Sequence, residues 1–161
     1  MSSATIKIEK LQYTGPLVLP NSIKIEIDFL QNVILPPQIL SYQNVWGVDF
    51  TVPVMDIREI CAEKIRVMSG RARYRDFYDL YLILDTHQID LQEVLELIKH
   101  KEIRTPITKT NIQQNWDIVL TQKSAGMEQI YYSRIVEDSA LEAMIKNLPF
   151  TKITTGKHHV S

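Results

Sequence analysis

The spacing of apolar residues changes once along this chain of 161 residues, at about Asp56. Before that point apolar and polar residues alternate, most clearly over 23–29, where Lys24, Glu26 and Asp28 separate the apolar side chains. A period of two is typical of a strand with one buried face, and it sends these three charged side chains to the other face. After Asp56 the apolar residues recur at helical spacing. The pattern predicts an α+β fold, with a small mixed sheet packed against a C-terminal helical bundle.

Residues 1–55 are expected to form this sheet. A first strand that ends at the turn signal Gly15-Pro16 is predicted to pair antiparallel with the strand over 23–29. The apolar residues of that second strand should face the core: Ile23, Ile25, Ile27 and Phe29. A further strand is predicted over 45–54, because this segment is rich in β-branched and aromatic residues.

Residues 56–150 are expected to form the helical part. Asp56 is a candidate N-cap, and Glu59 stands at the spacing of a capping box. The helix that begins there is predicted to end at Gly70. Further helices are predicted over 73–84, 91–100, 111–121 and 137–147. Residues 151–161 are expected to be a mobile tail.

Composition and charge limit the partners that the whole chain could attract. The formal net charge of -1 gives no global attraction to nucleic acid or to an anionic membrane, so such a partner would need a local basic patch. The single cysteine, Cys61, falls in a helical apolar pattern, which suits a reducing compartment. Neither a signal-peptide pattern nor a run of roughly 18 apolar residues is present. We therefore expect a cytoplasmic protein that does not bind a membrane.

Five charged residues crowd together around the start of the second predicted helix: Arg71, Arg73, Arg75, Asp76 and Asp79. The simplest interpretation is a solvent-exposed helix end with surface ion pairs, such as one between Arg75 and Asp79 one turn apart. The alternative is that the aspartates face inward and orient the arginines towards a phosphate group.

The segments that flank this cluster carry two motifs. Residues 59–65 read E-I-C-A-E-K-I, and residues 71–80 read R-x-x-x-R-D-x-Y-D-L. In order and spacing they resemble the paired AEKL and R-x-x-x-K/R-D-x-x-D-L motifs of the AbiEii/AbiGii toxin family of nucleotidyltransferases. The strand over 23–29 is similar to the family strand that carries the third active-site carboxylate.

The resemblance implies a member of the DNA polymerase β-like nucleotidyltransferase superfamily. Such proteins transfer a nucleotide from an NTP in the presence of Mg²⁺, some of them onto tRNA ends. It also implies a toxin, acting in phage defence or a toxin–antitoxin pair, with a cognate antitoxin encoded nearby. The resemblance assigns catalytic roles to Glu26, Lys64 and Asp79, nucleotide binding to Arg71, Arg75 and Asp76, and metal binding to Glu26 and Asp28.

The chain also departs from the family pattern. Family members begin with a Gly-Ser loop, followed by a D-x-D pair on the next strand. Neither motif occurs in this sequence. The resemblance thus covers the C-terminal half of a typical member, and we expect activity to need a second polypeptide that supplies the other half. Alternatives are a non-catalytic binding or regulatory module, an inactive truncated remnant, or a shortened piece of a longer protein. Glu26 could also simply pair with Lys24 on the strand surface.

Overall fold

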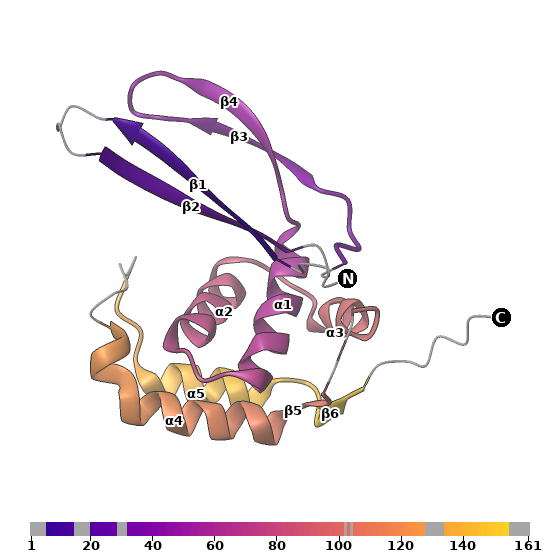
Figure 1. Cartoon of the computed structure of the whole chain (residues 1–161). Helices are drawn as coiled ribbons and strands as arrows, with labels where there is room; N and C mark the ends of the chain where they lie inside the picture. The colour runs from indigo at the N-terminus through magenta and orange to yellow at the C-terminus, as the bar shows by residue number, and fades with distance from the viewer. Residues whose placement is uncertain are drawn as a thin grey trace, which may run out of the picture. The chain divides into compact units, whose positions relative to one another are not determined.

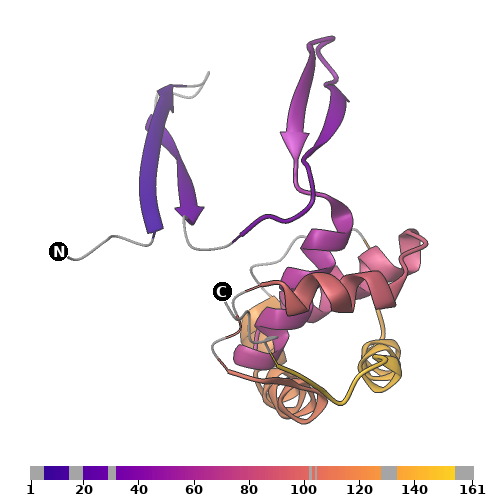
Figure 2. The same ribbon diagram turned by 90° about the vertical axis from the view of Figure 1, so that its right-hand side faces the viewer.

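The computed structural model of the chain divides into two compact units, Met1–Asn32 and Val33–Ser161. It describes residues 6–14, 20–28, 32–101, 103, 105–127 and 134–154. Figures 1 and 2 show the strands and helices of each unit. Helices and strands occupy separate stretches of the chain, and the strands form antiparallel pairs in the described ranges. The α+β class is confirmed.

The first unit contains a hairpin of β1 (Ile6–Thr14) and β2 (Pro20–Asp28). The strands pair antiparallel along their whole length, with Ile8 opposite Glu26 and Lys10 opposite Lys24. The predicted pairing of the first two strands is therefore confirmed. Backbone hydrogen bonds between the two antiparallel strands hold the described part of this unit together.

The apolar face of β2 is not buried, contrary to the prediction. Ile23 is 53% exposed, and Ile25 and Ile27 are each 38% exposed. A period of two separates apolar from charged side chains, but burial also requires a second layer. The described part of this unit contains only β1 and β2, so the unit itself supplies no second layer for the isoleucines. Phe29 lies outside the described residues.

The second unit begins with another hairpin, of β3 (Gln38–Gln43) and β4 (Asp49–Val54). The predicted strand over 45–54 is too long at its start, because residues 44–48 form the turn. The Asn44 side-chain oxygen accepts hydrogen bonds from the amides of Trp46 (3.0 Å) and Val48 (2.9 Å), and Gly47 has a φ of 76°. Local side-chain hydrogen bonding and a left-handed glycine thus override the strand propensity of Val45 and Trp46.

Five helices lie in the described part of the second unit, and the predicted helices are confirmed with shifts at their ends, the largest at the end of the helix predicted over 111–121. They are α1 (Ile57–Gly70), α2 (Tyr74–Thr86), α3 (Leu91–Lys99), α4 (Lys109–Met127) and α5 (Asp138–Asn147). Helix α1 packs against α2, α3 and α4. No helix in the described part of the chain is both long and apolar enough to cross a bilayer.

A short strand falls within the segment expected to be a tail. Strand β6 (Lys152–Ile153) pairs antiparallel with β5 (Ile107–Thr108), which precedes α4. Ile153 is only 5% exposed. This residue belongs to the core of the unit, so regular structure continues past residue 151, and residues 155–161 of the expected tail lie outside the described residues.

The core of the second unit forms around α1, α2 and α4. Trp116 is fully buried, with ring centroids 5.1 Å from Phe77 and 6.1 Å from Tyr74. Cys61 is also fully buried, and burial raises the pKa of its thiol to about 12. This cysteine therefore behaves as a small apolar core residue.

Asp56 caps α1 as predicted, but Glu59 does not complete a capping box. The Asp56 carboxylate accepts hydrogen bonds from the Arg58 amide (2.9 Å) and from the Gln38 side chain (3.2 Å). Its contacts with the Arg58 guanidinium lower the pKa of Asp56 to about 2. Glu59 is fully buried and points to other partners, described below. The buried lysine Lys101 binds the Glu59 carboxylate instead.

We expect Asp56→Ala to lower the free energy of unfolding by about 1–2 kcal/mol at neutral pH, through loss of the helix cap. Because the folded-state pKa of Asp56 lies below its ordinary value of 3.8, this contribution is present above pH 3.8. It should be lost as the pH falls towards 2. Urea unfolding of the wild type and the variant across this range would measure it.

The matched control for this test is Asp49→Ala, which removes an exposed aspartate at the start of β4. Its effect on the free energy of unfolding should be small and should not follow the same pH profile. If Asp56→Ala and Asp49→Ala were equally stable at pH 7, the helix would not depend on this cap.

Candidate functional site

Ion pairs between α1 and α2 bring the two sequence motifs together. The Lys64 ammonium on α1 donates to Asp79 Oδ2 at 2.7 Å and to Asp76 Oδ1 at 3.1 Å, and both aspartates belong to α2. Arg71, in the loop between the helices, donates to Asp76 from Nε (2.9 Å) and Nη2 (3.2 Å). The charged residues predicted from the sequence therefore form one cluster, which we call the α1–α2 cluster: Lys64, Arg71, Arg75, Asp76 and Asp79.

Asp76 is the centre of the α1–α2 cluster. It is 3% exposed and accepts hydrogen bonds from both Lys64 and Arg71. Burial alone would raise the pKa of Asp76, but the hydrogen bonds from Arg71 and Lys64 outweigh it and hold the pKa below its usual value. The carboxylate therefore stays ionised at neutral pH and fixes the positions of two cations.

The cations of the cluster differ in exposure. The side chain of Lys64 is 21% exposed, that of Arg71 45% and that of Arg75 72%. Arg75 Nε lies 3.6 Å from Asp79 Oδ2, which is an ion pair beyond hydrogen-bonding distance. The simple surface ion pair expected for Arg75 and Asp79 thus exists, but Asp79 is bound more closely by Lys64. Lys64 and Arg71 are oriented, whereas Arg75 reaches into solvent.

Glu26 belongs to the other unit, so its predicted convergence with Lys64, Arg75 and Asp79 stays a prediction. The Glu26 carboxylate forms an ion pair with Lys24 on the same strand, and its side chain is 59% exposed. The backbone of Asp28 is part of β2, but its side chain lies outside those that the structure describes. Among the described residues, no three acidic, histidine or cysteine side chains are grouped as they would be around a metal ion.

The sequence did not indicate the second ion-pair cluster, which is buried. Lys101, just after α3, is 2% exposed, and its ammonium lies 2.7 Å from Glu59 Oε2 and 2.9 Å from Glu63 Oε1. Glu59 Oε1 accepts hydrogen bonds from the backbone amides of Ile34 (2.8 Å) and Leu35 (3.2 Å). Glu59 therefore attaches the segment that precedes β3 to α1, and Lys101 attaches the end of α3.

The charge state of this buried cluster follows from its contacts. Burial works to raise the pKa of Glu59, but the Lys101 ammonium and the two backbone amides together lower it. An ionised glutamate and a charged lysine therefore share a site that water does not reach. Glu63 and Lys64 are neighbours on α1, so the buried cluster and the α1–α2 cluster use adjacent residues of one motif.

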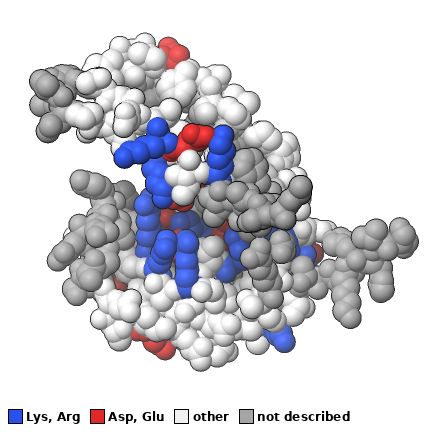
Figure 3. Space-filling view, viewed as in Figure 1, with Lys and Arg blue, Asp and Glu red and all other residues white. Residues whose placement is uncertain are grey.

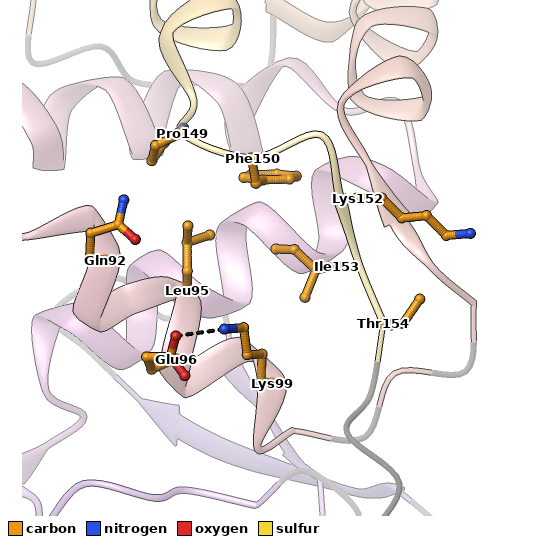
Figure 4. A pocket seen from close by; sticks show the side chains of 9 residues that line it. All are labelled: Gln92, Leu95, Glu96, Lys99, Pro149, Phe150, Lys152, Ile153 and Thr154. Atoms are coloured by element: carbon orange, nitrogen blue, oxygen red, sulfur yellow. Dashed lines mark hydrogen bonds and ion pairs between the residues drawn. The ribbon is translucent and has the colours of Figure 1, made fainter.

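Among the hollows elsewhere on the described second unit, two adjoin its helices. One, of about 330 Å³, is formed by α3 and the segment after α5, with Leu95, Phe150 and Ile153 on its walls and the Lys99–Glu96 ion pair at its edge (Figure 4). The other, of about 870 Å³, lies between the base of the β3–β4 hairpin and the start of α1. Neither is lined by a site residue predicted from the sequence.

The fold and the α1–α2 cluster define an α+β protein in which a buried aspartate holds a lysine and an arginine. The chain matches the family model described as "Nucleotidyl transferase AbiEii toxin, Type IV TA system" over residues 3–145. It belongs to this family of nucleotidyltransferase toxins, as the two motifs suggested. Nucleotidyltransferases generally use divalent metal ions. No curated protein and no solved structure matches the chain.

Proposed function

We propose that the chain is the nucleotide-binding part of a toxin that transfers a nucleotide from an NTP to an RNA acceptor. The observation that carries this proposal is the position of Lys64, which bridges Asp76 and Asp79 and so joins the two family motifs. A lysine ammonium has three N–H groups, and these aspartates use two of them. The third is available to a phosphate oxygen.

In this proposal the cations act on the triphosphate. The acceptor hydroxyl loses its proton to water as its oxygen bonds to the α-phosphorus, the bond from that phosphorus to the bridging oxygen breaks, and pyrophosphate leaves with the electron pair. Lys64, Arg71 and Arg75 stabilise the negative charge that grows on the leaving pyrophosphate. Asp76 and Asp79 position these cations, since both carboxylates already hold Lys64.

The residues present fit only part of a Mg²⁺ site. Carboxylate oxygens are the ligands that Mg²⁺ prefers, and the period of two puts Glu26 and Asp28 on the same face of β2. The described residues contain no group of three metal ligands, however, and Glu26 is already paired with Lys24. We therefore assign no step through a metal ion. We propose that a second polypeptide, bearing the Gly-Ser loop and the D-x-D strand, supplies further ligands.

The family also supports proposals about the setting of the reaction. A toxin–antitoxin family implies an antitoxin, which we propose is encoded nearby, and a role in phage defence. We further propose a tRNA end as the acceptor and the cytoplasm as the compartment, where NTPs and tRNA occur together.

The experiment that tests the proposed function is transfer of radiolabelled NTP to tRNA. We expect the chain alone to bind NTP weakly and to transfer no nucleotide, and to gain transfer when a polypeptide with the Gly-Ser loop and the D-x-D strand is added. In the active mixture, Glu26→Ala should abolish labelling. Glu9→Ala is the matched control, because Glu9 is an exposed glutamate on the neighbouring strand that pairs with Lys7 in the same way.

Labelling of tRNA by the chain alone, lost in Glu26→Ala, would show that the site needs no second polypeptide. Absence of both binding and transfer in every mixture would favour the inactive remnant over the enzyme. Equal labelling by the Glu26→Ala and Glu9→Ala variants would remove Glu26 from the site.

A second function, a non-catalytic docking module, is favoured by the β3–β4 hairpin. This sheet has two strands in the described residues, and Val45 and Trp46 at its tip are 90% and 83% exposed. Exposed strand edges and apolar side chains are features of sheets that accept further strands. Stable complex formation with the complementary polypeptide, without nucleotide transfer, would support this function.

A further inference from the structure

Arg73 lies between the defining positions of the second motif and belongs to the exposed side chains of this region. It stands between α1 and α2, and its side chain forms no hydrogen bond or ion pair with the described residues. Lys64 and Arg71, in contrast, are held by Asp76. A guanidinium that carries no internal interaction is free to bind a ligand without first breaking a contact.

The backbone places Arg73 beside the α1–α2 cluster. Arg71 and Arg73 both have extended backbone angles, with φ of -154° and -132°. In an extended segment, side chains two residues apart point to the same side. Arg73 is also the N-cap residue of α2, so the positive end of that helix adds to the local potential.

The charge of this region differs in sign from that of the whole chain. Lys64, Arg71, Arg73 and Arg75 supply four positive charges, and Asp76 and Asp79 supply two negative ones, which leaves +2 in a chain of net charge -1. Figure 3 shows Lys and Arg side chains gathered on one face of the helical unit. This is the local basic patch that a nucleic-acid partner of a slightly acidic chain requires.

We propose that Arg73 binds a backbone phosphate of a single-stranded RNA acceptor, while the α1–α2 cluster holds the triphosphate. This inference rests on the proposed function, because nucleotide transfer requires two polyanions to meet at one site. In this arrangement Asp76 orients Lys64 and Arg71 towards the triphosphate. The Arg73 side chain is close in sequence and pairs with no described residue, so it neutralises the RNA phosphate. This lowers the repulsion between the two substrates.

The test is fluorescence anisotropy of a labelled single-stranded RNA oligonucleotide titrated with the full chain over a range of salt concentrations. Arg73→Gln should weaken RNA binding by about three- to tenfold, for any RNA sequence, and reduce the slope of log Kd against log salt by about 0.7. Lys152→Gln is the control, since Lys152 is an exposed cation on β6 that lines the hollow of Figure 4. It should leave RNA affinity within about twofold of the wild type.

A second arm uses a fluorescent ATP analogue to separate RNA phosphate from triphosphate. Arg73→Gln should leave the affinity for the analogue within about twofold of the wild-type affinity. Arg75→Gln should reduce this affinity by more than Arg73→Gln does. Unchanged melting temperatures would show that both variants are folded, as expected for exposed side chains.

The inference is overturned if the wild type binds no RNA, if Arg73→Gln binds RNA like the wild type, or if it loses the ATP analogue as strongly as RNA. If the wild type binds RNA through Arg73 but neither binds nor transfers a nucleotide, the proposed function fails and the RNA site stands. The two claims are therefore separable by the same set of measurements.

Discussion

Glu59→Ala should lower the free energy of unfolding by about 3–5 kcal/mol, the largest stability effect that we expect from a single substitution in this chain. The change removes the nearer of the two glutamate carboxylates that pair with the buried Lys101 ammonium, and it removes the acceptor of the Ile34 and Leu35 amides. A buried ion pair that loses one partner and amides that lose their acceptor both cost free energy. Urea unfolding of the full chain, followed by circular dichroism, measures the loss.

The matched control is Glu96→Ala, which removes an exposed glutamate that also pairs with a lysine, Lys99, at 2.6 Å. Exposed ion pairs contribute little, so this variant should lose less than about 1 kcal/mol. The double variant Glu59→Leu/Lys101→Met should recover part of the loss, because apolar side chains then replace both members of the buried Glu59–Lys101 pair. If Glu59→Ala unfolded at the same urea concentration as Glu96→Ala, the buried cluster would not stabilise the fold.

Local patterns in the sequence were sufficient to predict the elements that carry the α1–α2 cluster. The helical spacing after Asp56 located α1, and its cap is the one observed. The charges of the second motif fall at the start of α2, within one turn of each other, so the geometry of a single helix already gathers Asp76 and Asp79. Only their joint partner, Lys64, comes from another helix.

Features that depend on distant residues could not be predicted in this way. Glu59 and Lys101 are 42 residues apart, and nothing near Lys101 marks it as a buried residue. Glu59 has the spacing of a capping box, which is a local interaction, but a buried lysine offers a stronger partner. The alternation in β2 likewise identified an apolar face without indicating what covers it. Burial is a property of the neighbouring layer, which the alternation does not describe.

Lys64→Met should weaken the binding of an NTP to the chain by about 10- to 100-fold, the loss expected for a charge-assisted hydrogen bond to a phosphate. The substitution keeps the length of the side chain but removes its charge and its N–H groups. It also leaves Asp79 with only the more distant Arg75, and so makes the site more negative. Lys64→Arg should retain more of the binding, since it preserves the positive charge.

The matched control is Lys99→Met, the same chemical change at an exposed lysine of α3 that pairs with Glu96. Its NTP affinity should equal that of the wild type. Melting temperatures of both variants would establish that they are folded, because Asp76 keeps its hydrogen bonds from Arg71 when Lys64 is replaced.

Calorimetric titration of a nonhydrolysable NTP analogue into the wild type, Lys64→Met and Lys99→Met is therefore the most direct test that the α1–α2 cluster is the triphosphate site of this nucleotidyltransferase. The account predicts binding by the wild type and Lys99→Met, displaced by pyrophosphate, and a loss of at least about tenfold in Lys64→Met. Equal affinities of Lys64→Met and the wild type would contradict it, because the cations of the cluster would then serve only to hold α1 and α2 together.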